Sequence, residues 1–194
     1  SLRKFIGDVQ PTVVKEEKKL IFTSANADQV CKKAISAGKA AILTEGEQAG
    51  IFTPVKRVTA ATYDEGTCIV ASGNAKEFAS MLSDSSVTKY GYDLKLQRNI
   101  LSSNGIDLQG RFMDIELMHY LINPEKSHKI EILSKTYLDI NLEDSLPEKK
   151  EEAPLSLFDD VPEDESDASD RFPETAATLL LGDKSREEME KMEL

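Results

Sequence analysis

Three consecutive segments decide the fold: residues 91–101 (GYDLKLQRNIL), 105–110 (GIDLQG) and 113–124 (MDIELMHYLINP). A predicted strand at residues 87–90 precedes them, and they predict a helix over about residues 93–103 and a second, strongly apolar helix over residues 112–122. Because the apolar residues of the second helix spread beyond one stripe, we expect this helix to be buried on most sides. These residues are Ile115, Leu117, Met118, Leu121 and Ile122.

Toward the N-terminus, short β-branched runs alternate with helical periodicity, which indicates an α/β or α+β domain. Residues 57–63 and 67–71 predict a hairpin, since Asp64-Glu65-Gly66 between them has the length and the glycine of a hairpin loop. With a further strand at residues 40–44, we expect this half of the domain to form a small, largely antiparallel sheet.

Helix-start signals occur on both sides of this predicted sheet. Asn26 and Gln29 form a capping pattern that predicts a helix, and Gly38 is placed to end it in the left-handed conformation. Asn74 and Glu77 repeat the capping pattern before a short predicted helix.

Charge is distributed unevenly along the chain. Residues 1–142 hold 18 Lys and Arg against 17 Asp and Glu, whereas residues 143–194 hold 6 against 18. Residues 151–170 carry nine acidic and no basic side chains, so we expect a mobile loop there. The predicted organisation is a main body over residues 1–150, this acidic loop over residues 151–170, and a C-terminal helix of the same domain over residues 171–194.

The acidic loop contains one apolar group, Leu155, Leu157 and Phe158. These side chains could anchor the loop locally, or they could bind a partner, in which case the chain would work as an interaction module. The composition fits both interpretations.

Composition excludes several classes of protein. The longest apolar runs span only a few residues, so no transmembrane segment is expected. The N-terminus lacks both the apolar stretch of a secretory signal and an initiating Met, which suggests an excised piece. Two cysteines and two histidines cannot form a Cys-rich zinc site. We expect Cys31 and Cys68 in the core. His119 and His128 lie on different predicted helices, and we expect structural or surface roles for both. We also expect a monomer in the reducing cytoplasm.

The three segments resemble the 3'-5' exonuclease domain of bacterial DNA polymerase I, the family A polymerase. That family commonly reads G-x-N-L-K-Y-D-x-x-x-L, then G-I-x-L-x-G-x-x-F-D-T, then Y-L-L-N-P, and the match covers residues 91–124. The resemblance implies a ribonuclease H-like α/β fold with a mixed sheet of about five strands flanked by helices. It also implies that a polymerase domain normally follows in the same chain.

Exonuclease chemistry in that family requires carboxylates, because two divalent metal ions must lie close together to activate water and stabilise the leaving oxygen. Four acidic positions hold the ions in active members. The first motif, D-x-E, corresponds to Leu43-Thr44-Glu45, so Leu43 replaces the Asp and Glu45 remains. The Asp that ends N-L-K-Y-D corresponds to Gln97, a neutral amide.

The third motif, Y-x-x-x-D, falls at the start of the last predicted helix. With Arg171 in place of the Tyr, Thr175 stands for the Asp, and with Phe172 in that place, Ala176 does. Neither register supplies a carboxylate. The resemblance therefore implies a catalytically silent domain that binds no metal or other cofactor and is retained as structural support for DNA synthesis in replication and repair. Mg2+ is expected only for the polymerase domain.

An alternative is an active metal-dependent 3'-5' exonuclease with relocated carboxylates, for which Glu45 and Asp93 are the candidates. Asp93 and Asp114 also suit helix N-termini, where a carboxylate is favoured. In the resemblance neither of these two residues is a metal ligand, so we favour the capping role for both.

Several basic residues could flank a DNA cleft: Lys56, Arg57, Lys89, Lys95, Arg98 and Arg111. Residues 1–142 are nevertheless close to neutral and lack the basic stripe of an independent nucleic-acid binder. We expect this domain alone to bind DNA weakly, the parent polymerase to supply most DNA contact, and no membrane partner.

Overall fold

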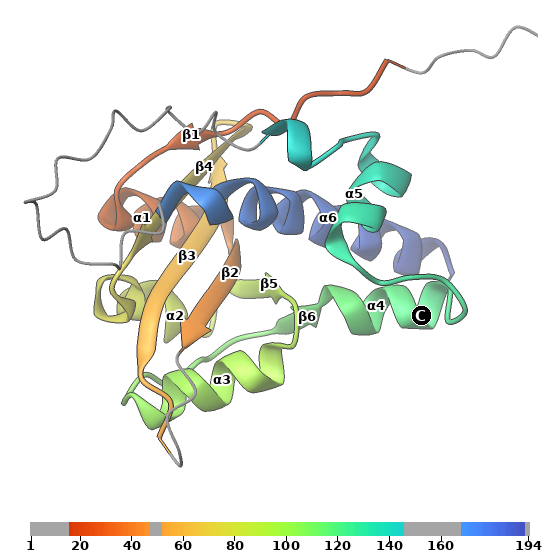
Figure 1. Ribbon diagram of the computed structural model, residues 1–194. Coiled ribbons are helices and arrows are strands. Elements are labelled where there is room, and N and C mark those ends of the chain that lie inside the picture. Colours follow the sequence, from red (N-terminus) through yellow and green to blue (C-terminus); the bar gives the residue numbers. More distant parts are fainter. Residues whose placement is uncertain (1–15, 47–51, 146–167, 193–194) are drawn as a thin grey trace, which may run out of the picture.

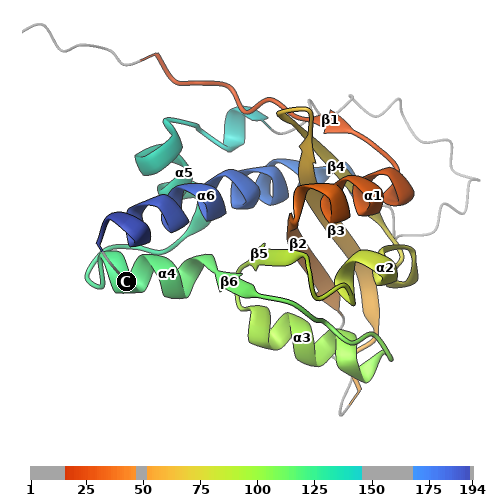
Figure 2. The same cartoon turned by 180° about the vertical axis from the view of Figure 1, so that it is seen from behind.

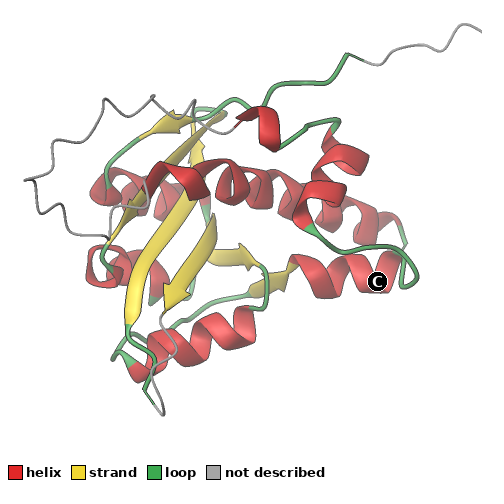
Figure 3. Cartoon of the chain, viewed as in Figure 1, coloured by secondary structure: helices red, strands yellow, loops and turns green. Residues whose placement is uncertain are grey.

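The computed structural model describes residues 16–46, 52–145 and 168–192, and these residues form a mixed sheet with helices on both faces (Figures 1 and 3). In chain order the elements are β1 (Thr23–Ser24), α1 (Ala27–Ala37), β2 (Lys39–Gly46), β3 (Val55–Asp64), β4 (Thr67–Gly73), the 3-10 helix η1 (Ala75–Phe78), α2 (Ala79–Leu82), β5 (Thr88–Gly91), α3 (Leu94–Ser103), β6 (Phe112–Asp114), α4 (Ile115–Ile122), α5 (Ile130–Leu138), the 3-10 helices η2 (Glu143–Ser145) and η3 (Ala168–Arg171), and α6 (Phe172–Lys191). The acidic loop, with Leu155, Leu157 and Phe158, lies outside the described residues.

The sheet has the strand order β1-β4-β3-β2-β5-β6. The central strands β2, β3 and β4 are antiparallel neighbours, whereas β1, β5 and β6 pair in parallel with β4, β2 and β5. This confirms the predicted α/β class and the antiparallel first half. The sheet has six strands, against about five expected, and the two short strands at its edges, β1 and β6, have no predicted counterpart.

The predicted hairpin is confirmed. Strands β3 and β4 pair down to Asp64 and Thr67. The two residues between them, Glu65 and Gly66, both have positive φ, 48° and 82°. Two consecutive positive φ values are the signature of a type I′ turn, whose twist matches that of the strands it joins.

Side-chain alternation along the strands separates two cores. On β2, Ala40 and Ile42 face the cluster under α1, α2 and α3, whereas Ala41 faces the cluster under α4, α5 and α6. The two opposite views show α6 across one face of the sheet and α1 and α2 against the other (Figures 1 and 2). Cys31 and Cys68 are buried, as predicted.

Both predicted capping patterns position helices. The Asn26 side chain accepts a hydrogen bond from the backbone N–H of Gln29 at 2.8 Å, and Gly38 ends α1 with φ 74°. Asn74 and Glu77 form a reciprocal capping box at the start of η1. The local sequence therefore fixes where both helices begin.

The prediction for residues 112–122 is wrong in two respects. Phe112–Asp114 is a strand, β6, which pairs with Lys89–Gly91 of β5, and only Ile115–Ile122 is helical. The helix α4 is not buried on most sides, because it extends past the edge of the sheet and packs mainly on α6 (Figure 1). Leu117 and Leu121 are 64% and 58% exposed.

Helix α6 is fixed to the sheet by Asp183. Its carboxylate accepts hydrogen bonds from the Tyr90 hydroxyl at 2.9 Å and from Lys39 Nζ at 2.8 Å. The next residue toward the N-terminus, Gly182, lies against the Tyr90 ring so closely that a Cβ there would overlap it. In the described part of the chain, no helix is both long enough and apolar enough for a membrane span.

Candidate nuclease-like site

The site begins at an open edge of β2. This strand pairs with β5 only from Lys39 to Ala41, whereas on its other side it pairs with β3 as far as Gly46. Beyond Ala41, therefore, no strand of the described residues pairs with this edge of β2. A cleft of about 490 Å³ lies there, lined by Thr44, Glu45, Gly46, Thr53, Lys56, Leu96, Ile100 and Arg171.

Gln97, from α3, closes the open edge. Its Oε1 accepts a hydrogen bond from the backbone N–H of Thr44 at 2.9 Å, and its Nε2 donates to the carbonyls of Tyr92 at 2.8 Å and Ile42 at 3.4 Å. The side chain is 4% exposed. An amide suits this place because it donates at one end and accepts at the other, whereas a carboxylate only accepts.

Glu45 points to the α6 side of β2 and is held by two arginines. Its Oε2 lies 2.7 Å from Nε of Arg57, and its Oε1 lies 3.3 Å from Nε of Arg171. Burial raises the pKa of Glu45, but the hydrogen bond and charge of Arg57, followed by the charge of Arg171, lower that pKa below its ordinary value. Both oxygens of the carboxylate are thus occupied by guanidinium groups.

The remaining motif positions, Leu43 and Thr175 or Ala176, offer no carboxylate. Leu43 is an apolar, half-buried residue of β2. Thr175 is buried in α6, and its hydroxyl donates to the carbonyl of Arg171 at 2.8 Å. Ala176, the alternative position, is buried too. Within residues 16–46, 52–145 and 168–192, no group of three or more His, Cys, Asp and Glu side chains could hold a metal ion.

The relocated-carboxylate pair is not brought together. Asp93 is the N-cap of α3, where its side chain accepts from the backbone N–H of Leu96 at 3.2 Å. It lines a second cleft that shares no lining residue with the cleft at Glu45. The backbone of Asp93 is left-handed, with φ 46°, so the chain turns sharply as it enters α3.

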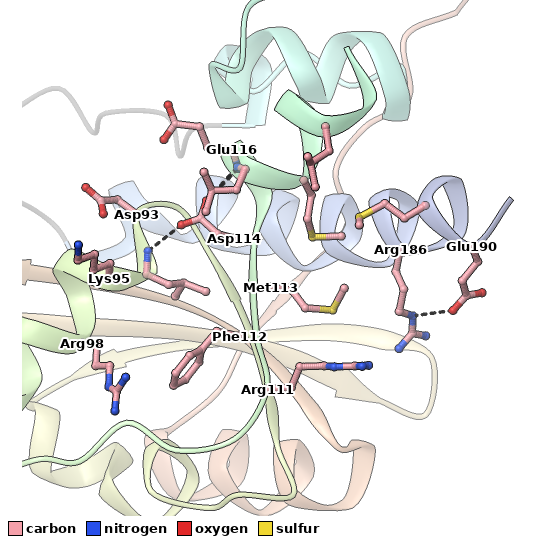
Figure 4. A pocket seen from close by; sticks show the side chains of 15 residues that line it. Asp93, Lys95, Arg98, Arg111, Phe112, Met113, Asp114, Glu116, Arg186 and Glu190 are labelled. Carbon is pink, nitrogen blue, oxygen red and sulfur yellow. Dashed lines mark hydrogen bonds and ion pairs between the residues drawn. The ribbon is translucent and has the colours of Figure 1, made fainter. Parts of the chain in front are cut away.

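Asp114 lies beside Asp93 and caps two helices at once (Figure 4). Its Oδ2 accepts from the backbone N–H of Leu94, the first residue of α3, at 2.9 Å. Its Oδ1 accepts from the backbone N–H groups of Glu116 and Leu117 at 3.1 and 3.3 Å. Both acids therefore have the capping roles that the sequence favoured.

The sequence prediction is wrong for one of the candidate DNA-contacting residues. Lys89 is fully buried, and its Nζ donates to the carbonyls of Asp84 at 2.7 Å and Gln109 at 2.6 Å. Burial lowers the pKa of Lys89 to about 8. This lysine ties two loops together and cannot flank a cleft.

The two histidines form a cluster that the sequence did not reveal. The Nδ1 atoms of His119 and His128 lie 2.6 Å apart, and Nε2 of His119 lies 3.1 Å from the Tyr137 hydroxyl. Asn123 donates to the same hydroxyl at 3.0 Å. The buried, hydrogen-bonded His119 fits the predicted structural role. The contact between the two histidines was missed because His128 lies in the loop that joins α4 to α5, whose course no local pattern encodes.

Comparison with known proteins agrees with the geometry. Residues 60–144 match the family model described as DNA polymerase I, ribonuclease H-like domain. The resemblance to the exonuclease domain of DNA polymerase I is confirmed. No curated protein matches the sequence.

Solved structures with the same fold include polymerase and nuclease chains. The POL domain of Pol1 from M. smegmatis, in complex with DNA primer-template and dNTP, matches with a TM-score of 0.62 and 15% identity over 89% of this chain and 28% of that chain. The catalytic core of RRP6 from Trypanosoma brucei matches with a TM-score of 0.58 and 10% identity over 90% of this chain and 49% of that chain. NrnC from Brucella melitensis matches with a TM-score of 0.55 and 16% identity over 88% of this chain and 82% of that chain. The chain spans less than two thirds of the length of the first two of these chains, and the likeness shows a shared fold.

Proposed function

We propose that this chain is a catalytically silent 3'-5' exonuclease-like domain of a DNA polymerase I and acts as a structural support for DNA synthesis in replication and repair. The observation that carries the proposal is the state of the four motif positions. One carboxylate, Glu45, remains, and Arg57 and Arg171 neutralise it. Gln97 is used to close the edge of β2. Two Mg2+ ions need several anionic oxygen ligands around them, which this arrangement does not provide.

The same reasoning supports a biochemical activity that lies elsewhere in the polypeptide. A polymerase domain on the same polypeptide, with its own Mg2+, would supply nucleotide transfer and most DNA contact. The match to Pol1 in its DNA complex supports this context. We infer a cytoplasmic protein that works as a monomer on DNA.

A nuclease assay tests the proposal. A single-stranded oligonucleotide labelled at its 5' end is incubated with the protein in Mg2+ or Mn2+, and shortening from the 3' end is followed on a gel. We expect the wild type and Glu45→Gln to be indistinguishable from each other and from buffer. Metal-dependent shortening that Glu45→Gln removes would instead establish the alternative, an active exonuclease with relocated carboxylates.

A further inference from the structure

The histidine cluster lies outside the nuclease-like site and has no part in the proposed function. His119 comes from α4, where it is 3% exposed, and Tyr137 comes from α5. His128 is half-buried in the loop of residues 123–129, which joins the end of α4 to the start of α5 (Figure 1). The cluster therefore links this loop to both helices.

The contact between the two rings requires one proton between them. The Nδ1 atoms lie 2.6 Å apart, and neither two bare nitrogen atoms nor two N–H groups can face each other at that distance. Asn123 donates to the Tyr137 hydroxyl at 3.0 Å, which leaves the hydroxyl proton for Nε2 of His119 at 3.1 Å. In the neutral cluster, His119 then carries its own proton on Nδ1 and donates it to His128.

A metal ion does not account for this contact. A zinc site takes three or four protein ligands, and among the residues that the structure describes no group of three or more His, Cys, Asp and Glu side chains could hold an ion. Two imidazole nitrogens on one tetrahedral zinc ion would also stand about 3.3 Å apart, which is farther than the 2.6 Å between His119 and His128. The ligand of the pair is a proton.

The cluster accepts one added proton but not two. The first can bind Nε2 of His119, because the Tyr137 hydroxyl can turn and accept the new N–H, and one proton still lies between the rings. The second must bind Nδ1 of His128, and two N–H groups of two cations would then face each other. The pair therefore takes up its protons in two steps, and the second step breaks the contact.

The surrounding charges oppose the second proton as well. Burial, and then the charges of His128 and Lys126, lower the pKa of His119. Helix α5 adds the Tyr137 hydroxyl, and α6, which packs against both helices, adds no charged group to those that act on His119 within the described chain. The other charged side chains of the loop are exposed: Glu125 and Lys129. Among the described residues, no carboxylate offsets the charge of a doubly protonated pair.

We propose that residues 123–129 form a proton-operated latch, which is held against α4 and α5 while His119 and His128 share a proton and is released when both rings are protonated. His128 is the ring that leaves, because it is half-exposed on the loop, whereas His119 is buried in α4. Its departure also ends its contact with the Tyr120 ring, whose centroid lies 5.8 Å away. The backbone hydrogen bond from Lys126 to the carbonyl of Asn123, at 3.2 Å, joins the loop only to itself. The latch does not depend on the proposed function.

NMR relaxation measured at two pH values tests the latch. Order parameters of the backbone amides of residues 125–128 are determined at pH 7.5 and at one pH unit below the midpoint of the His119 ring titration. We expect values near about 0.85 at pH 7.5 and below about 0.6 at the lower pH. Ala60 and Ala61, which are buried in β3, should stay rigid at both. Simultaneous loosening of these two residues would overturn the proposal, because release of the latch is local.

His128→Gln is the decisive variant. Its side-chain amide can donate to or accept from Nδ1 of His119 and carries no charge, so we expect order parameters in the loop that do not change with pH. Lys129→Gln, which removes an exposed charge from the same loop, should release the loop as the wild type does. A wild-type loop that stays rigid after both rings are protonated would overturn the proposal, and so would pH-dependent release in His128→Gln.

Discussion

Gln97 of α3 lies against the open edge of β2 and accepts a hydrogen bond from the backbone N–H of Thr44 at 2.9 Å. At this point the neighbouring strand β5 no longer pairs with β2. The side-chain amide takes over from the missing strand, donating to Ile42 as well as accepting from Thr44. Gln97 stands where the resemblance implies a metal-binding Asp, and it has a structural role of its own.

The first prediction concerns the charge of this side chain. Gln97→Glu removes the donors to Tyr92 and Ile42 and buries a carboxylate beside their carbonyls, so we expect a loss of roughly 2–4 kcal/mol in the free energy of unfolding. Urea unfolding measures it. Asn99→Asp makes the corresponding amide-to-acid change at an exposed position of α3 and should change stability little. Equal effects of the two substitutions would show that the amide at Gln97 is not required.

The second prediction concerns acid stability. The folded-state pKa of Glu45 is below its unfolded value of about 4.5. The ion pairs therefore stabilise the fold fully above that unfolded value, and their contribution is lost as the pH falls through the folded pKa. Glu45→Gln should lower stability at pH 7 and make it less sensitive to acid between pH 5 and 3. Unchanged acid sensitivity in urea titrations would rule this out.

The third prediction concerns the histidine cluster. Burial, then the charges of His128 and Lys126, lower the pKa of His119 below 6.5. Because the folded pKa is depressed, stability is complete above the unfolded value and falls as the pH drops through the folded value. NMR titration of the ring protons should place the His119 midpoint below 6.5, and His128→Gln should raise it. A wild-type midpoint at or above 6.5 would contradict the packing described.

The fourth prediction tests how α6 lies on the sheet. Gly182→Ala inserts a methyl group into the space of the Tyr90 ring, so we expect a loss of about 1–3 kcal/mol from overpacking, despite the higher helix propensity of alanine. Lys184→Ala, two residues further along α6, is the control and should have a small effect. Thermal unfolding compares them, and a stabilised Gly182→Ala variant would mean that α6 is seated elsewhere.

Features encoded within a few residues could be predicted from the sequence. Asn26 and Gly38 mark the two ends of α1, and Glu65-Gly66 marks the hairpin, because capping and turn geometry depend on neighbouring residues alone. The order of the motifs in residues 91–124 also predicted the fold.

Features that depend on tertiary packing could not be predicted. The apolar pattern of α4 contains no information on how many sides are covered, so Leu117 and Leu121 were assigned to the interior. Neither the pairing of Glu45 with Arg171, 126 positions along the chain, nor the contact of His119 with His128 has a local signal. The absence of three motif carboxylates was visible, but the role that Gln97 took on was not.

The central claim is that this site does not hold a pair of divalent ions, and direct metal binding tests it. Mn2+ is titrated into the protein and the free ion is measured by electron paramagnetic resonance, with Glu45→Gln in parallel. We expect wild type and Glu45→Gln to bind Mn2+ equally weakly, without a saturable site. Saturable binding of two ions that Glu45→Gln abolishes would contradict it.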